Sequence, residues 1–305
     1  MMRYLDPKAD LTFKKIFGKH PDLLISLLNA LLPLDDDEQI ESIEYLHNEL
    51  VPELYRHKNS IVDVLCKDIN GRQFCVEMQM EWSNSFKQRV LFNASKLYVT
   101  QAQSRERYKE LRPVYSLNLV NDIFERDMPN EFIHNYRITH DKDTKKVIEG
   151  LHFTFIELPK FTPQTILEKR MAILWLRFLT EINADTQQIP AELQKDPKIN
   201  KALEELKITG FSEEELRAYD KFWDGVRVEK ALQQDSFDEG EAKGRAEGRA
   251  EGRAEGLLEG RAEGKNEEKI ENAKRFLALG LSPEQVAQGT RLTIEEVLAL
   301  VHSKN

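Results

Sequence analysis

Apolar and polar side chains predict a β-hairpin in the first third of the chain. Residues 60–68 and 73–80 are rich in β-branched and other apolar residues, and Asn70-Gly71 lies between them. Asn-Gly is the strongest short hairpin signal, because these residues readily adopt left-handed turn conformations. Side chains alternate between the two faces of the second strand. The polar face carries Cys75, Glu77 and Gln79, and the apolar face, which should point to the core, carries Phe74, Val76, Met78 and Met80.

The remaining periodicity predicts a mixed α/β core. Gly18 and Pro21 divide the first helical stretch, and Pro113 separates the long helix from the strand after it. The order of helix, three strands, long helix, strand and later strand is typical of a sheet flanked by helices. Helical spacing covers 10–31, 84–110 and 164–235, and strand patterns cover 40–48, 114–120 and 151–158.

A short repeat dominates the chain from Gly240 to Gly264. Glycine occurs there at every fourth residue, in the frame Gly-Arg-Ala-Glu. Each glycine costs a helix about 1 kcal/mol relative to alanine, and the period places Arg over Arg and Glu over Glu, so the usual i,i+4 ion pairs are missing. The segment is therefore either a charged, flexible or semi-helical linker, or a helix that packs closely on a second copy with Arg rows meeting Glu rows.

The last segment has the pattern of a compact helical unit. Gly280 ends one helix, Ser282-Pro-Glu-Gln caps the next, and Thr293-Ile-Glu-Glu caps a third. Short helices joined at Gly289 resemble a helix-turn-helix, but the last one begins with acidic side chains where DNA reading needs basic ones. DNA reading and a structural or partner-binding cap both remain open.

Composition limits the class of protein. Of the 305 residues 40% are hydrophobic and 32% are charged. The longest apolar stretch, 171–179, is too short for a membrane span and contains Arg177. No basic lead into an apolar region occurs at the N-terminus, so we expect no signal peptide and a cytoplasmic protein in which Cys66 and Cys75 are reduced.

The charge is distributed unevenly. The net charge of −9 argues against a surface covered by nucleic acid, but it allows a local basic surface. Residues 87–112 carry seven basic and two acidic side chains. This surplus directly follows the acidic hairpin, as expected if acidic metal ligands work beside a phosphate backbone.

Two carboxylates on the hairpin are the strongest chemical signal. Asp63 lies on the first predicted strand and Glu77 follows fourteen residues later on the second, so a suitable register brings them together on the polar face. Carboxylates a few ångströms apart repel each other unless a cation lies between them. Oxygen ligands with open positions for water suit Mg²⁺, with Mn²⁺ as an alternative. The other reading is an ordinary hairpin with solvated acidic residues.

The chain resembles the PD-(D/E)XK nuclease superfamily, and within it the Rpn-type branch of recombination-promoting nucleases or transposases. The resemblance covers nearly the whole chain, including the glycine repeat and the small C-terminal unit. The residues that carry it are Asp10-x-x-Phe13-Lys14-x-x-Phe17-Gly18, Asp63-Val64, Gly71, Glu77-Met78-Gln79, Arg89 and Tyr98.

The resemblance implies a restriction-endonuclease-like mixed β-sheet core flanked by helices, with a helical C-terminal extension. It implies hydrolysis of DNA phosphodiesters with Mg²⁺, with Asp63 and Glu77 as metal ligands and the carbonyl of Met78 completing the sphere. The expected segments are a nuclease-like domain, a helical extension, the glycine-repeat helix or linker, and the C-terminal unit: 1–180, 181–235, 236–268 and 269–305.

Gln79 departs from the superfamily pattern, which usually has lysine at this position. A neutral amide can only orient by hydrogen bonds, so the positive charge must come from elsewhere, although members of this branch are similar in carrying glutamine. Lys14 is the leading candidate if the first helix packs beside the sheet. Asp10 either caps that helix or adds a carboxylate to the site.

The long helix provides the expected substrate contacts. Arg89 could bind phosphate, while Tyr98 and Gln101 could line the cleft. The expected protein is a Mg²⁺-dependent DNA endonuclease that promotes recombination or transposition-like events, with its tail forming a homodimer or higher oligomer. The alternative is a nuclease fold with weak or no catalysis that binds DNA or proteins through its C-terminal part.

Overall fold

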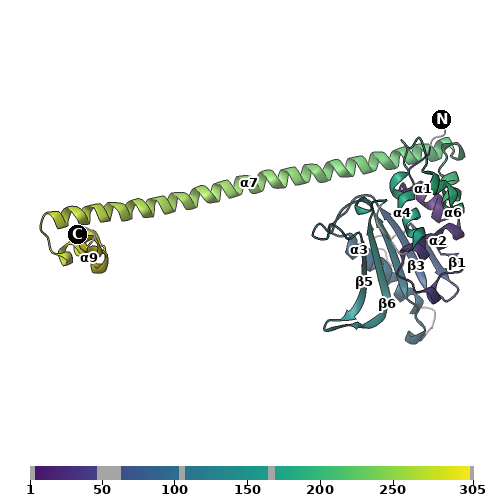
Figure 1. Ribbon diagram of the computed structural model, residues 1–305, viewed down its shortest axis with the longest axis horizontal. Helices are drawn as coiled ribbons and strands as arrows, with labels where there is room; N and C mark the ends of the chain where they lie inside the picture. Colours follow the sequence, from purple (N-terminus) through teal and green to yellow (C-terminus); the bar gives the residue numbers. More distant parts are fainter. Residues whose placement is uncertain (1–3, 47–62, 103–106, 164–168, 303–305) are drawn as a thin grey trace, which may run out of the picture. The chain divides into compact units, whose positions relative to one another are not determined.

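The computed structural model describes residues 4–46, 63–102, 107–163 and 169–302 (Figure 1). The chain forms two compact units, Met1–Lys230 and Ala231–Asn305, which are considered one at a time below. The four segment limits expected from the sequence stay predictions.

A mixed sheet of six strands forms the centre of the first unit, in the order β1-β2-β3-β4-β6-β5. β1, β2 and β3 are antiparallel neighbours, β3, β4 and β6 run parallel, and β5 returns antiparallel to β6. This confirms the restriction-endonuclease-like α/β class. The strands are β1 Ile43–Tyr45, β2 Val64–Asp68, β3 Gln73–Gln79, β4 Val114–Val120, β5 Ile133–His140 and β6 Asp143–Glu157.

The predicted hairpin between β2 and β3 is confirmed, and its turn is held by Asp68. The Asp68 carboxylate accepts hydrogen bonds from the Asn70 and Arg72 backbone N–H groups, at 3.0 and 2.8 Å, and from Arg72 Nε at 2.7 Å. Gly71 has φ 79°, in the region that favours glycine. Residues 60–62 of the predicted first strand lie outside the described residues, and Asp63 forms a bend just before β2.

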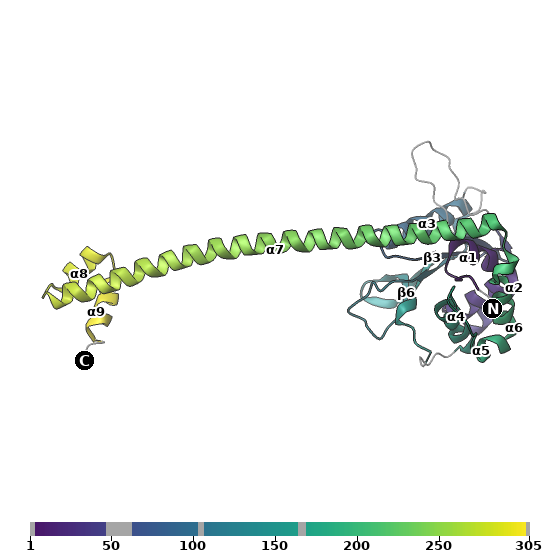
Figure 2. The ribbon, with the colours of Figure 1, turned by 90° about the horizontal axis from the view of Figure 1, so that it is seen from above.

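Helices cover both faces of the sheet (Figures 1 and 2). On one face, Phe74 and Val76 pack with Phe13, Phe17 and Trp175 in the main core. On the other, α3 covers Leu65 and Cys75. The helices of the first face are α1 Asp10–Phe17, α2 Pro21–Leu31, α4 Arg170–Glu181, α5 Ala191–Lys195 and α6 Pro197–Glu205, and α3 is Phe86–Ala102.

Two predicted elements have different limits in the structure. The helix expected over 84–110 ends as α3 at Ala102, and a separate 3₁₀ turn forms Tyr108–Glu110. The strand expected over 151–158 is only the second half of β6. β5 pairs along both halves of β6, and its side chains beyond His134 are mostly exposed. The exposed end of this hairpin therefore shows little of the in-out alternation that identifies a half-buried strand.

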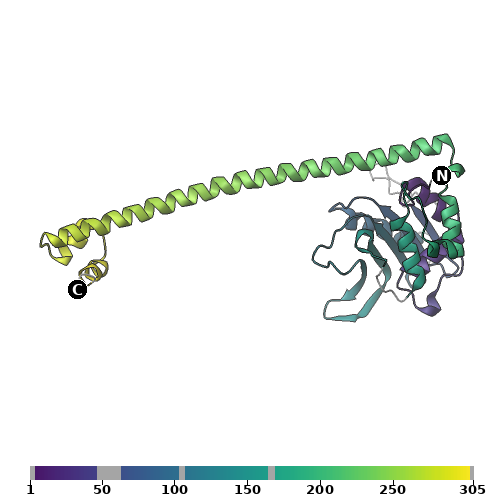
Figure 3. The same cartoon turned by 45° about the horizontal axis from the view of Figure 1, so that its top comes forward.

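The helical region expected over 164–235 is divided by loops, and its last helix is very long. α7 runs without a break from Glu213 to Ala278 and includes the glycine repeat (Figure 3). Its first turns belong to the first unit, where Tyr219 is buried against Leu5 and Ala9, and the Tyr219 hydroxyl accepts a hydrogen bond from the Asp6 N–H at 2.9 Å. Just before α7, Lys15 Nζ donates to the Gly210 carbonyl at 2.9 Å.

The second unit ends in two short helices, α8 Pro283–Thr290 and α9 Ile294–His302. Both predicted caps are confirmed, because Ser282 and Thr293 accept from the N–H groups of Gln285 and Glu296. The expected joint at Gly289 is wrong: Gly289 lies inside α8, and the chain turns at Arg291, which has φ 60°. A small core of Ala273, Val286, Ala287, Leu292 and Val297 holds these helices on the end of α7.

Candidate active site

The two predicted carboxylates lie on the same part of the hairpin. Val64 pairs with Val76, so Asp63, one residue before β2, lies level with Glu77 on β3. Asp63 Oδ2 accepts a hydrogen bond from the Met78 N–H at 2.7 Å, which fixes the side chain against the neighbouring strand. Glu77 itself is only 7% exposed. Hairpin register thus brings together the two groups that are far apart in sequence.

Helix α3 provides two partners for this acidic pair. Asn93 Nδ2 donates to Glu77 Oε1 at 2.9 Å, and Arg89 Nη2 donates to Gln79 Oε1 at 2.5 Å. The same Arg89 nitrogen is 3.9 Å from Glu77 Oε2. Residues 89 and 93 are about one helical turn apart and therefore lie on one face of α3. Because α3 and β3 run in opposite directions here, Arg89 contacts Gln79 and Asn93 contacts Glu77.

Helix α1 provides the second cation. Lys14 Nζ is 2.6 Å from Asp10 Oδ1 and 4.0 Å from Asp63 Oδ1. Of the two roles predicted for Asp10, that of a helix cap is wrong, because Ala9 is the N-cap of α1 and no side chain caps it. Asp10 instead holds Lys14 beside Asp63. The structure therefore brings a lysine to the acidic pair from one side and an arginine from the other.

Burial makes both carboxylates less acidic than usual. It raises the pKa of Asp63 from 3.8 to about 6, against the lowering effect of the Met78 hydrogen bond. The negative charge of Asp10 raises this pKa further, as does that of Glu77, while Lys14 lowers it. Burial likewise raises the pKa of Glu77, while Asn93 and Arg89 act in the opposite direction. Raised pKa values in a pair of neighbouring carboxylates are typical of functional sites, where a bound cation would stabilise the charged forms.

The donor set fits a hard divalent cation such as Mg²⁺. One oxygen of each carboxylate is held by an N–H group, while Asp63 Oδ1 lies 4.0 Å from Lys14 Nζ and Glu77 Oε2 lies 3.9 Å from Arg89 Nη2. Within the described ranges, no group of three His, Cys, Asp or Glu side chains could hold a metal. Mg²⁺ is compatible with this, because it is often bound by one or two carboxylates together with waters and substrate phosphates.

Two predicted substrate residues lie at the other end of the sheet. Gln101 donates to the Arg112 carbonyl at 3.0 Å and accepts from the Arg112 N–H at 2.9 Å, next to the start of β4. Tyr98 packs beside Leu151, and its ring would lie 3.2 Å from a Cβ added to Gly150. Because β3 and β4 run parallel, these contacts are at the end of the sheet opposite Gln79. The structure does not bring Tyr98 and Gln101 to the acidic pair.

Asn93 is the site residue that the sequence reasoning missed. It is 2% exposed, and a buried asparagine inside a helix needs a polar partner. The spacing of four residues between Arg89 and Asn93 indicates that both lie on one face of a helix. The sequence does not give the register of α3 against β3, which decides that this face meets Glu77. The polar face predicted for β3 is covered by α3, where Cys75 is buried with Ala94 and Leu97.

The surface around α3 is less basic than the sequence predicts. Lys87 Nζ is 2.5 Å from Glu125 Oε1 and 3.3 Å from the Tyr136 hydroxyl, so its charge is neutralised locally. Arg89, whose side chain is 50% exposed, remains open to an anion from solvent. In the part of the chain that the structure describes, no helix has the length and apolarity that a bilayer crossing requires.

Comparison with known proteins identifies the family. The family model described as PD-(D/E)XK nuclease family transposase matches residues 7–226, which contain α1, the whole sheet, α3 and the first turns of α7. No curated protein and no solved structure gives a match. The match includes every residue of the acidic pair and its partners, and it extends over more than half of the 305 residues. The chain belongs to the PD-(D/E)XK nuclease family transposases.

Proposed function

We propose that this protein is a Mg²⁺-dependent DNA endonuclease that acts in recombination or transposition-like events. The observation that carries the proposal is the pair Asp63 and Glu77, each with one oxygen held by an N–H group and the other turned to a cation. Burial raises the pKa of both carboxylates, which means that their charged forms are disfavoured in the protein alone. A bound metal ion would stabilise these charges, whereas a purely structural role would leave them uncompensated.

In this proposal Asp63, Glu77 and the Met78 carbonyl would hold the metal, with Mn²⁺ as a substitute for Mg²⁺. When bound, the ion would supply a water of lowered pKa and would neutralise charge on the phosphate. Lys14 and Arg89 bind the phosphate oxygens from two sides and stabilise the charge that develops on them. Gln79 holds Arg89, while its own Nε2 donates to the Glu81 carbonyl at 2.7 Å, so it acts as a positioning residue.

Self-association through the repeat is part of the same proposal. From residue 249 to 263 the charged residues keep the spacing of the repeat, except that Leu257-Leu258 replaces one Arg-Ala pair. No Arg in this range has a Glu three or four positions away. The ion pairs Glu241–Arg245 and Lys243–Glu247 occur only where the first repeat reverses this order. A Cβ on any repeat glycine would meet nothing within 4 Å. A second α7 would provide opposite charges and cover the glycine rows, giving a homodimer with two nuclease sites.

The two cysteines support a cytoplasmic setting for this activity. Cys66 and Cys75 are both free and buried, as suits a reducing cytoplasm. The alternative function, a DNA- or protein-binding module without catalysis, is favoured by one observation: Gln79 stands where the superfamily usually has a catalytic lysine. Arg89 reduces the force of this objection, since its guanidinium lies beside Gln79.

Plasmid cleavage with and without Mg²⁺ tests the proposal. The wild-type protein is compared with Asp63→Ala and Glu77→Ala, and with Glu44→Ala, which removes an exposed acid on the edge strand β1. Cleavage that needs Mg²⁺, survives Glu44→Ala and is lost in the other two variants supports the endonuclease. Equal cleavage in all four proteins would show a contaminant, and no cleavage by the wild type would favour the binding module.

A further inference from the structure

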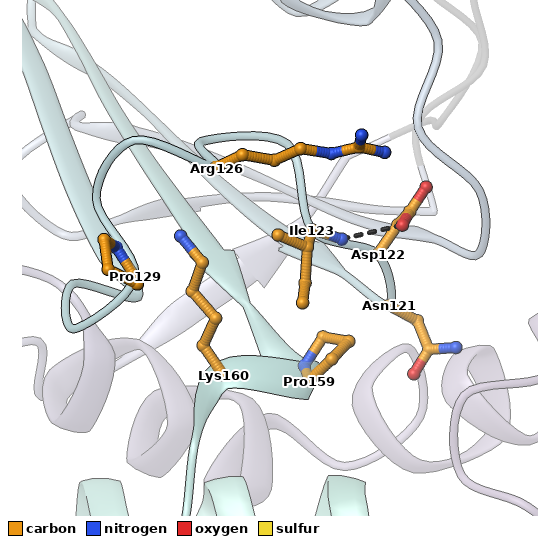
Figure 4. Close-up of a pocket in the computed structure, with 7 residues that line it drawn as sticks. All are labelled: Asn121, Asp122, Ile123, Arg126, Pro129, Pro159 and Lys160. Carbon is orange, nitrogen blue, oxygen red and sulfur yellow. Dashed lines mark hydrogen bonds between the residues drawn. The ribbon is translucent and has the colours of Figure 1, made fainter.

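A preformed cavity of about 570 Å³ lies beside the proposed nuclease site (Figure 4). It is formed by the loop after β4 and by the residues that follow β6. Ile123, Pro129 and Pro159 give it an apolar lining, and Arg126, Lys160, Asn121 and Asp122 lie around them. Its volume is within the range of small-molecule sites, about 300–1,000 Å³.

The cavity is close to the acidic pair along the parallel strands. The Asn121 N–H donates to the Gln79 carbonyl at 2.8 Å, so the loop begins directly beside Gln79. Glu77 lies two residues earlier on β3, which corresponds to about 7 Å. Since successive phosphates on one DNA strand advance by about 3.4 Å along the helix axis, the cavity lies within a few nucleotides of a phosphate held at Glu77.

The loop that forms the cavity is fixed by buried polar groups. The carboxylate of Glu157, which is fully buried, accepts from the N–H groups of Phe124 and Glu125 at 2.5 and 3.0 Å and pairs with His134 and Lys160. Lys160 Nζ also donates to the carbonyls of three loop residues, Glu125, Met128 and Glu131, at 2.6, 2.9 and 3.1 Å. A ligand would therefore meet a site whose shape is already ordered.

One charged group at this cavity is available to a ligand. Among the described residues, Arg126 forms no hydrogen bond or ion pair with the rest of the protein, while Lys160 and the carboxylate of Asp122 are already engaged. In Figure 4 the Arg126 side chain extends above Ile123, Pro129 lies to the left and Pro159 lies below Ile123. The cavity thus combines an apolar lining with a single free guanidinium.

We propose that this cavity receives one unpaired nucleotide of the DNA substrate, with the base against Ile123, Pro129 and Pro159 and the phosphate on Arg126. A nucleotide has both an apolar-faced ring and an anion, and only an unpaired one can offer its ring faces, because stacking in a duplex covers them. Pockets that receive extruded bases hold them between apolar or aromatic side chains in this way. The inference rests on the proposed function, since DNA must lie across the adjacent acidic pair.

The inference is tested by DNA binding without metal, so that cleavage does not interfere. The full-length protein is titrated into two labelled duplexes that differ by one unpaired 2-aminopurine nucleotide, and affinity is read from fluorescence anisotropy. The wild type should bind the duplex with the unpaired nucleotide about tenfold more tightly, because extrusion from a paired duplex costs free energy. Ile123→Trp fills the cavity from a side chain that is 40% exposed, and it should reduce this ratio to about one.

Arg126→Gln provides a second variant that leaves the apolar lining intact, and it should lower the ratio as well. Arg137→Gln is the matched control, because Arg137 is an exposed arginine on β5, and the ratio should remain that of the wild type. Equal affinity of the wild type for both duplexes would overturn the inference. So would an Ile123→Trp protein that keeps the preference, or one that loses affinity for both duplexes alike.

Parallel plasmid cleavage with Mg²⁺ separates this inference from the proposed function. A protein that shows the preference but never cleaves DNA would remove the nuclease proposal and leave the nucleotide site standing. A protein that cleaves DNA but shows a ratio of one would remove the nucleotide site alone. Absence of binding to either duplex would remove both.

Discussion

Arg89 on α3 donates a hydrogen bond to Gln79 on β3 over 2.5 Å, and the same nitrogen lies 3.9 Å from Glu77. A guanidinium thus lies beside the position where the superfamily usually has lysine. The glutamine that replaces that lysine is the residue that holds the arginine. The charge that the motif lacks in β3 is therefore available from the neighbouring helix.

Removal of this arginine should reduce catalysis strongly. We expect Arg89→Ala to lower the rate of plasmid cleavage by about 10²-fold, the effect of losing one donor at a developing oxyanion. The double variant Arg89→Ala/Gln79→Lys should recover at least about tenfold of this loss, since it returns a cation to the motif position. Arg137→Ala, on the exposed part of β5, is the control and should cleave at the wild-type rate. A double variant slower than Arg89→Ala would contradict this account.

Asp63 should make the metal-free protein less stable at neutral pH. Its pKa is about 6 in the folded protein and 3.8 ordinarily. Between these values the folded state binds more protons than the unfolded state, so the free energy of unfolding falls as the pH rises through this window and remains lower above it. Asp63→Asn cannot ionise and should raise the free energy of unfolding at pH 8 by about 1–2 kcal/mol, with a much smaller effect at pH 4.

Urea unfolding at the two pH values, with a chelator present, measures this difference. Glu44→Gln is the control, because Glu44 is exposed and should change neither value. Addition of Mg²⁺ should stabilise the wild type but not Asp63→Asn, since a ligand that binds only the folded state raises its stability. An Asp63→Asn protein that is less stable than the wild type at pH 8 would be the opposite result.

Asn93 should act by positioning Glu77 for the metal. Asn93→Leu removes the 2.9 Å hydrogen bond to Glu77 Oε1. The Mg²⁺ concentration for half-maximal cleavage should rise by about tenfold, which is the usual scale for losing a group that orients a metal ligand. The rate at saturating Mg²⁺ should remain close to that of the wild type.

A structural asparagine provides the comparison for that experiment. Asn29 bonds the backbone of Ile40 on both its amide and carbonyl sides, far from the acidic pair in the fold. Asn29→Leu should lower the free energy of unfolding by about 1–3 kcal/mol and leave the Mg²⁺ requirement unchanged. A purely structural role for Asn93 would give the same result in both variants.

The repeat should support association through complementary charges. We expect the wild type to have a solution mass of at least two protomers, and the mass should fall to one when residues 236–305 are deleted. Reversal of Arg249, Arg253 and Arg261 to Glu should also give a monomer, because like charges then meet. High salt should weaken the association in the same direction.

A mixing experiment controls for damage to the helix itself. A second variant reverses Glu251, Glu255 and Glu263 to Arg in the same repeat. Each variant alone should be monomeric, and the two together should form a heterodimer, measured by light scattering. Two variants that remain monomeric when mixed, or a wild type that is monomeric with and without the tail, would remove the self-association proposal.

The sequence was sufficient for the features that depend on local patterns. Asn70-Gly71 fixed the hairpin, and the hairpin carried both acidic residues, so the class of fold and the acidic pair followed from short-range rules. The helix α1 was predicted with Lys14 on it, but its packing beside Asp63 depends on long-range contacts that no local pattern encodes. The same holds for Asn93, whose role follows from the register between α3 and β3.

The errors also have local physical causes. Tyr98 and Gln101 lie on the helix that carries Arg89, which made them candidates for the cleft. Each is two or three helical turns further along α3, however, and a helix advances about 1.5 Å per residue, so they reach the other end of the sheet. The hairpin of β5 and β6 was missed in part because its exposed half buries neither face and shows no period of two.

Two consecutive lysines give α1 a double role. Lys14 faces Asp63, while Lys15 reaches the Gly210 carbonyl and the ring of Phe211, just ahead of α7. α1 has only eight residues and is packed along its length. One short helix of two turns therefore joins the start of α7 to the ammonium group beside Asp63, so the tail and the acidic pair depend on the placement of the same element.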